Sequence, residues 1–300
     1  MSRSLSRRSA LQVMGAGLLL PMWAQQQTML TRTIPSSGEK LPAVGLGTWR
    51  QFDVGSSASE RQPLMQVLKN MHAKGGMTID SSPMYARSEQ VVGDLANDVG
   101  LADKYFYATK VWTSGREEGI EQMESSMRKM RRSQMDLLQI HNLLDWQTHI
   151  VTLRKWKEEK KVRYIGLTHY VDSMHEDLEK IIRAEKPDFV QFNYSIRGRN
   201  AEKRLLNAAK DNGVAVILNQ PFDGGSLFDN VRGKALPSFA AEYGIKTWAQ
   251  YFLKYILSHD AVTCAIPGTS DPLHALQNME AMFGLLPDNK TRKKMVEYLA

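Results

Sequence analysis

The chain has 300 residues, 42% of them hydrophobic and 24% charged, with a formal net charge of +7, so it can bury a large core. Basic residues are mixed with acids, as in residues 155–161, which is typical of the solvated face of a helix and argues against a nucleic-acid-binding surface. The single cysteine, Cys264, excludes an internal disulfide, and its apolar neighbours predict a buried thiol.

Residues 1–24 carry the pattern of a twin-arginine (Tat) export signal. Arg7 and Arg8 precede an apolar stretch at residues 11–23, and no acidic side chain occurs in this segment. The stretch is shorter than the ~20 residues that a transmembrane helix needs, so no stable membrane span is expected. We therefore expect a signal segment at 1–24, a folded domain at 25–300, and export to the periplasm by the Tat machinery. A basic tail on a cytoplasmic protein is the alternative.

Short apolar runs that alternate with helical patterns occupy the rest of the chain. A short hairpin is expected first, around residues 31–34 and 40–41. Each later run is short and apolar enough to be a buried strand, and such alternation predicts a parallel sheet. The predicted strands are residues 43–47, 77–80, 105–110, 137–141, 162–168, 189–193, 214–219 and 262–267.

Each predicted strand is followed by a helical segment. Eight such units of about thirty residues match a closed (β/α)₈ TIM barrel, an α/β fold in a single domain, better than an open sheet. The predicted helices are residues 60–74, 88–96, 117–131, 146–159, 173–184, 202–211, 240–257 and 272–282, with an extra C-terminal helix at 292–299.

Four polar residues fall at or just beyond the ends of three successive strands. Asp80, Lys110 and His141 end the second, third and fourth strands, and Tyr85 lies on the loop that follows Asp80. The active site of such a barrel lies at the carboxyl ends of its strands, so these side chains are expected to meet there. Separately, each residue has a structural explanation, such as a helix cap or a rim charge. Together they indicate a proton-transfer site.

These four groups suit the reduction of a carbonyl compound. Tyrosine ordinarily titrates near ~10, and a nearby ammonium such as that of Lys110 would lower this pKa. Asp80 would keep Lys110 charged, and a neutral His141 would donate a hydrogen bond to the substrate oxygen. Tyr85 would then deliver a proton. No side chain supplies hydride, so a cofactor must. An aldolase or phosphosugar isomerase with Lys110 as a Schiff-base amine is an alternative.

Seven motifs resemble those of the aldo-keto reductases, and the resemblance extends from about residue 30 to the C-terminus. It implies that Tyr85 is the acid, that Lys110 and Asp80 tune it, and that His141 orients the carbonyl. It also implies a nicotinamide dinucleotide bound across the barrel mouth without a Rossmann domain. The motifs are Gly45–Trp49, Asp80–Tyr85, Ala108–Trp112, Gln139–Asn142, Gly166–Tyr170, Gln191–Tyr194 and Ile266–Ser270.

The resemblance also implies where the cofactor and the substrate bind. Trp49 and Trp112 would line the substrate mouth, and no metal is expected. Asn219 occupies a position at which many members stack an aromatic ring on the nicotinamide. Thr168, His169 and Gln191 match positions that hold its carboxamide. The full implied cofactor set is Gly47, Thr48, Thr168, His169, Gln191, Asn219, Pro221, Phe222, Thr269, Ser270, His274, Gln277 and Asn278.

The choice between NADPH and NADH depends on the segment from Gly268 to Asn278. Many members carry lysine or arginine at the positions held here by Gly268 and His274, and Asp271 disfavours a phosphate. NADPH is the expectation by resemblance, with NADH as the alternative. A small carbonyl compound is the expected substrate. A non-catalytic sensor that binds the nucleotide on the same barrel is the alternative function.

Overall fold

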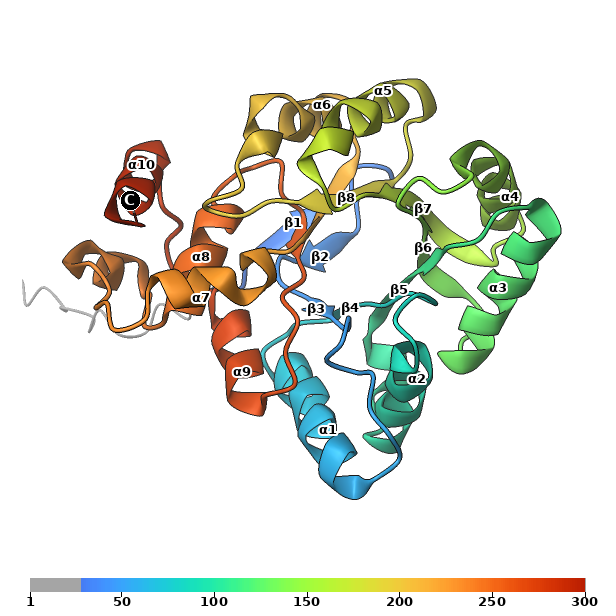
Figure 1. Ribbon diagram of the computed structural model, residues 1–300, viewed down its shortest axis with the longest axis horizontal. Coiled ribbons are helices and arrows are strands. Elements are labelled where there is room, and N and C mark those ends of the chain that lie inside the picture. The colour runs from blue at the N-terminus through green and yellow to red at the C-terminus, as the bar shows by residue number, and fades with distance from the viewer. Residues whose placement is uncertain (1–27, 300) are drawn as a thin grey trace, which may run out of the picture.

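A parallel sheet of eight strands curls into a barrel that the helices surround (Figure 1). This computed structural model describes residues 28–299. Neighbouring strands pair in chain order, and bridges from Val44 to Ala265 and from Gly47 to Gly268 join the first strand to the last. The predicted (β/α)₈ barrel is therefore confirmed. Its strands are β3 (Leu46–Gly47), β4 (Thr78–Asp80), β5 (Phe106–Val111), β6 (Met135–His141), β7 (Val162–Thr168), β8 (Phe189–Asn193), β9 (Ala215–Asn219) and β10 (Cys264–Ala265).

The helices bury apolar stripes against the outside of the barrel. In α1, for example, Leu64, Val67, Leu68 and Met71 recur at helical spacing and are all fully buried. The helices are α1 (Ala58–Ala73), α2 (Ser88–Asp98), α3 (Arg116–Lys129), α4 (Trp146–Glu158), α5 (His175–Glu185), α6 (Leu205–Asp211), α7 (Ser226–Asn230), α8 (Trp248–Leu257), α9 (Pro272–Glu280) and α10 (Asn289–Leu299).

The predicted N-terminal hairpin, β1 (Thr31–Thr33) and β2 (Lys40–Pro42), is present and covers the bottom of the barrel. Ile34 and Leu41 belong to the same buried cluster as Phe106 and Phe189, which start β5 and β8. This cluster fills the amino-terminal end of the barrel. The carboxyl-terminal end is the one left open for a site.

The predicted helix at residues 240–257 is wrong in its first half. Gly244 adopts a left-handed conformation with φ 66°, which ends a short 3₁₀ segment, Ser238–Tyr243. Helix α8 then begins afresh, with the Thr247 side chain accepting a hydrogen bond from the Gln250 N–H. Helix α7 was not predicted, since its five residues lie in a polar loop.

The buried thiol that the sequence predicts is also present. Cys264 is fully buried on β10, and burial raises its pKa to about 12. Within residues 28–299 no helix is long and apolar enough to cross a bilayer. The Tat signal predicted at residues 1–24 lies outside the described residues.

Replacement of Gly45 by alanine is expected to weaken closure of the barrel. An added Cβ would lie 2.7 Å from the Thr78 carbonyl oxygen and 3.3 Å from the Cys264 Sγ, so backbone would have to move. Overpacking of this kind lowers the free energy of unfolding by about 1–3 kcal/mol. Urea unfolding measures the free energy of unfolding of each variant. Gly198→Ala is the control, because the nearest atom to its added Cβ is the Ser195 hydroxyl oxygen, 3.3 Å away. Equal stability of the two variants would contradict the prediction.

Candidate active site

Three of the four predicted catalytic residues sit at the ends of adjacent strands. Asp80 ends β4, Lys110 lies near the end of β5, and His141 ends β6. The Lys110 Nζ lies 2.6 Å from the Asp80 Oδ2 and donates a second hydrogen bond to the Ser81 carbonyl at 2.7 Å. Burial is the largest single influence and would lower the pKa of Lys110, but Asp80 and Tyr85 together outweigh it and raise this pKa. Lys110 is therefore a buried ammonium at neutral pH.

Two glutamines complete the surroundings of the Asp80 carboxylate. Gln139 Nε2 and Gln191 Nε2 donate to Asp80 Oδ1 at 3.0 and 2.9 Å, while Oδ2 accepts from Lys110. Sequence reasoning assigned Gln191 to the cofactor and gave Gln139 no role. The alternation of β6 could have revealed it, because Gln139 and His141 lie two residues apart and face the same side of the strand.

Tyr85 lies over the buried ion pair. The Lys110 Nζ is 5.0 Å from the centroid of the Tyr85 ring, and this ring meets the His141 ring edge to face at 5.8 Å. Burial raises the pKa of Tyr85, and the Lys110 ammonium opposes that rise without reversing it. The expected lowering of this pKa is therefore wrong in direction, because desolvation of a phenolate outweighs one nearby cation. At neutral pH the phenol holds its proton.

His141 is neutral and fixed by a hydroxyl. Burial, together with the Lys110 charge, lowers the pKa of His141 to about 2. The Ser82 Oγ lies 2.9 Å from the His141 Nδ1 and accepts from the Met84 N–H at 3.1 Å. The Ser82 hydroxyl can donate to Nδ1, and in that tautomer the proton of His141 lies on Nε2. The ring can then donate a hydrogen bond into the cavity.

This neutral histidine should make the fold sensitive to acid. In the unfolded chain His141 binds a proton near pH ~6.5, whereas in the folded protein it binds one only near pH 2. The free energy of unfolding therefore decreases as the pH is lowered between these two values. At about pH 5 the loss from this residue alone is ~2 kcal/mol. Urea unfolding of the parent and His141→Gln at about pH 7.5 and pH 5 measures it. The variant should lose less stability on acidification, and parallel losses would contradict the assignment.

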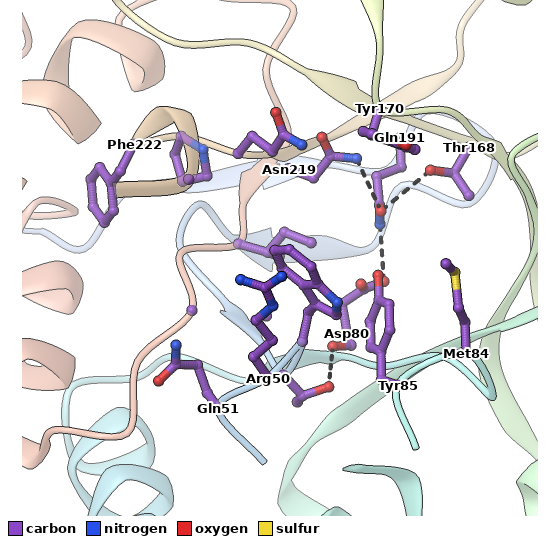
Figure 2. Close-up of a pocket in the computed structure, with 18 of the residues that line it drawn as sticks. Arg50, Gln51, Asp80, Met84, Tyr85, Thr168, Tyr170, Gln191, Asn219 and Phe222 are labelled. Carbon is purple, nitrogen blue, oxygen red and sulfur yellow. Dashed lines mark hydrogen bonds between the residues drawn. The ribbon is translucent and has the colours of Figure 1, made fainter. Parts of the chain in front are cut away.

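Asp80, Tyr85 and His141 line a cavity of about 510 Å³ at the carboxyl ends of the strands. Figure 2 shows Tyr85, Asp80 and Gln191 toward one end of it and Phe222 toward the other. Residues of the predicted set that line it are Gly47, Thr48, Trp49, Asp80, Tyr85, His141, Thr168, Gln191, Asn219, Pro221 and Phe222.

A second cavity of about 290 Å³ continues the first, and the two share Phe222, Phe228 and Gly268. The predicted residues Thr269, His274, Gln277 and Asn278 line it. The two cavities form one elongated cleft. Sequence reasoning missed several lining residues, which lie on loops or in short helical segments and at a helix start: Arg50, Gln51, Met84, Tyr170, Gly224, Gly225, Phe228 and Trp248.

Four predicted residues do not line either cavity. Lys110 is fully buried against Asp80 and reaches neither one. His169 stacks on Tyr170, with ring centroids 5.6 Å apart, and Ser270 is exposed beside the second cavity. Trp112 lies outside the first cavity but keeps its ring 6.4 Å from that of His141. The structure therefore brings together the catalytic set and most of the predicted cofactor set.

The cleft has the polar groups that a nicotinamide dinucleotide needs at its two ends. Asn219 Oδ1 in the first cavity and Asn278 Oδ1 in the second are buried acceptors without a hydrogen-bond partner within the described chain. Nicotinamide and adenine each carry an amino group that can donate to such an oxygen. Buried acceptors are rarely left unpaired, so both ends of the cleft fit the group.

Comparison with known proteins agrees with this geometry. The chain is 28% identical over 258 residues to methylglyoxal reductase YeaE of Escherichia coli, which covers 83% of this chain and 89% of that protein. It is 26% identical over 252 residues to the NADH-specific methylglyoxal reductase of the same organism, covering 70% of this chain and 72% of that one. An aldo-keto reductase of Klebsiella pneumoniae, solved with NADPH, superposes with a TM-score of 0.75 at 25% identity, covering 90% and 96%.

A family model also matches most of the chain. The model described as "Aldo/keto reductase family" matches residues 43–293, which include all four residues of the catalytic set and both cavities. The chain therefore belongs to the aldo/keto reductase family and is an NAD(P)H-dependent oxidoreductase.

Proposed function

We propose that this protein reduces an aldehyde or ketone to the alcohol, with hydride from a bound nicotinamide and a proton from Tyr85. The observation that carries the proposal is the Asp80–Lys110 ion pair of 2.6 Å beneath the Tyr85 ring, beside the cavity that Tyr85 and His141 line. These groups can bind, orient and protonate a carbonyl oxygen.

Each side chain has a separate part in the proton transfer. His141 Nε2–H donates a hydrogen bond to the carbonyl oxygen, and Ser82 keeps the imidazole in that tautomer. As negative charge grows on this oxygen, the Tyr85 hydroxyl gives up its proton to it. The Lys110 ammonium stabilises the phenolate that remains, and Asp80 holds the ammonium in place. When bound, the dinucleotide supplies the hydride.

The cleft suggests how the cofactor lies. Thr168 Oγ1 and Asn219 Nδ2 lie 3.4 Å from Gln191 Oε1, and these residues would hold the nicotinamide carboxamide near Tyr85. Thr269, Gln277 and Asn278 would hold the adenosine end. We assign His169 to positioning Tyr170, whose N–H donates to His169 Nδ1 at 3.0 Å.

The substrate side of the cleft favours small carbonyl compounds. Trp49, Met84 and Tyr170 line the mouth and are each about half exposed, which gives an apolar surface near Tyr85. Trp112 would border it through His141. Two curated relatives are named methylglyoxal reductases, so 2-oxoaldehydes are the first substrates to test.

The decisive experiment is a substrate panel. Purified protein is mixed with NADH or NADPH and with simple aldehydes, ketones and 2-oxoaldehydes, and consumption of the dihydronicotinamide is followed by absorbance. We expect consumption with at least one aldehyde. Binding of nucleotide without consumption on any compound would favour the sensor alternative. Borohydride trapping of a carbonyl substrate on Lys110 would favour an aldolase, although a fully buried, ion-paired ammonium is poorly suited to attack.

We also propose that residues 1–24 direct export through the Tat machinery, which carries folded proteins. The support is the Arg7–Arg8 pair before the apolar stretch. Cell fractionation of the parent and of a variant with both arginines replaced by lysine tests it, with mass and nucleotide content measured in each fraction. Parent protein in the periplasm, and its absence there in the variant, is the expected result. An uncleaved parent in the cytoplasm would support the cytoplasmic alternative.

A further inference from the structure

The second cavity lies beside the amino-terminal end of α9, where a helix usually offers free N–H groups to a phosphate. Here those groups are already used. Asp271 Oδ1 accepts from the Leu273 N–H at 2.7 Å and from the His274 N–H at 3.1 Å, and Pro272 has no N–H. The helix end therefore presents a carboxylate where an anion would otherwise bind.

No lysine or arginine among the described residues lines this cavity, and His274 is its one side chain that can become cationic. The pKa of Asp271 lies below its ordinary value because the N–H groups of His274 and Leu273 donate to it. This carboxylate is therefore ionised at neutral pH. The other charged groups near α9, Lys74 and Glu280, pair with each other at the far end of the helix.

NADPH differs from NADH by a phosphate on the adenosine ribose, and this end of the cleft would receive that ribose. Asn278 Oδ1, which has no hydrogen-bond partner among the described residues, would accept from the amino group of an adenine bound in this cavity. A bound phosphate needs cationic or multiple hydrogen-bond partners. Here it would lie beside the helix end that Asp271 caps, and no lysine or arginine of the described chain lines the cavity to pair with it.

We infer that the adenosine end of this cleft selects NADH over NADPH. The inference rests on the proposed function, because it assumes that the nicotinamide lies at the Tyr85 end of the cleft. It concerns which of the two dinucleotides binds more tightly, and the cleft accepts both.

The test measures the dissociation constants of both dinucleotides for the full chain by titration calorimetry, at roughly pH 8 in a chloride buffer without phosphate. The readout is the ratio of the Kd for NADPH to the Kd for NADH. We expect NADH to bind about tenfold more tightly, which corresponds to the loss of one charge-assisted contact.

Two variants test the cause. Asp271→Asn keeps the helix cap and removes its charge, so the ratio should fall about three- to tenfold. His274→Arg places a guanidinium on the cavity wall, and the ratio should fall at least about tenfold, toward a preference for NADPH. Circular dichroism checks the fold, and Asp271→Ser replaces the asparagine variant if that fails to fold.

Each outcome bears on the inference. Equal affinities, or tighter binding of NADPH by the parent protein, would overturn it. An unchanged ratio in both Asp271→Asn and His274→Arg would show that this helix end does not contact the ribose phosphate, and would overturn it too. If neither dinucleotide bound, the proposed function itself would fail.

Discussion

Replacement of Tyr85 by phenylalanine is expected to lower kcat by about 10²–10⁴-fold while the protein still binds its dinucleotide. The variant keeps the ring that lies 5.0 Å from the Lys110 Nζ and loses only the proton donor. Steady-state kinetics and nucleotide titration measure the two quantities separately. Loss of kcat with retained binding is what a proton donor predicts.

The control is Tyr170→Phe, since Tyr170 is a second phenol on the wall of the same cavity, and its loss should change kcat far less. The pH profile gives an independent check. An acid works only while protonated, so activity should fall as the pH rises through the pKa of Tyr85. Burial raises that pKa above its ordinary value of ~10, so the fall belongs at strongly alkaline pH. Full activity of Tyr85→Phe would remove the basis of the proposed mechanism.

Replacement of Lys110 by methionine is expected to lower the free energy of unfolding by about 3–5 kcal/mol and to abolish reduction. Lys110 is fully buried, and its removal leaves the Asp80 carboxylate with only the Gln139 and Gln191 amides as partners. An uncompensated buried charge is costly, so the folded state loses stability. Urea unfolding at neutral pH measures this loss.

An exposed lysine provides the matched control. Lys180 pairs with Glu176 and Asp177 on the surface of α5 at 3.2 and 3.3 Å, and Lys180→Met should change stability by less than about 1 kcal/mol. The double variant Asp80→Asn/Lys110→Met should recover part of the loss, because it removes the unpaired charge. If Lys110→Met were as stable as Lys180→Met, the Asp80–Lys110 ion pair would not be buried as the structure shows.

The sequence was sufficient to predict the fold and to predict that the four proposed catalytic residues lie together, because both depend on the ends of strands. Alternating strands and helices leave few arrangements besides a barrel, and the parallel register then places Asp80, Lys110 and His141 together. The break at Gly244 was harder to predict, because the surrounding pattern is helical and only the backbone conformation shows where the helix stops.

Other features of the site depend on competing energies that residue types do not reveal. The pKa of Tyr85 is set by burial against one cation, and the sequence shows the cation without showing the burial. The role of Ser82 depends on a 2.9 Å contact across strands, and that of Gln139 on a shared carboxylate. The second cavity is built from five separate stretches of the chain, residues 222, 228, 247–249, 268–269 and 274–278, so no single motif indicates its shape.

The burial of Cys264 affects how readily carbonyl compounds can inactivate this protein. Reactive carbonyl compounds inactivate many enzymes by adding to thiolates, and only the thiolate form is an effective nucleophile. The single thiol of the chain is fully buried on β10, and its pKa of about 12 keeps it protonated. An enzyme that binds electrophilic carbonyl compounds at every turnover therefore has no thiolate to which they can add.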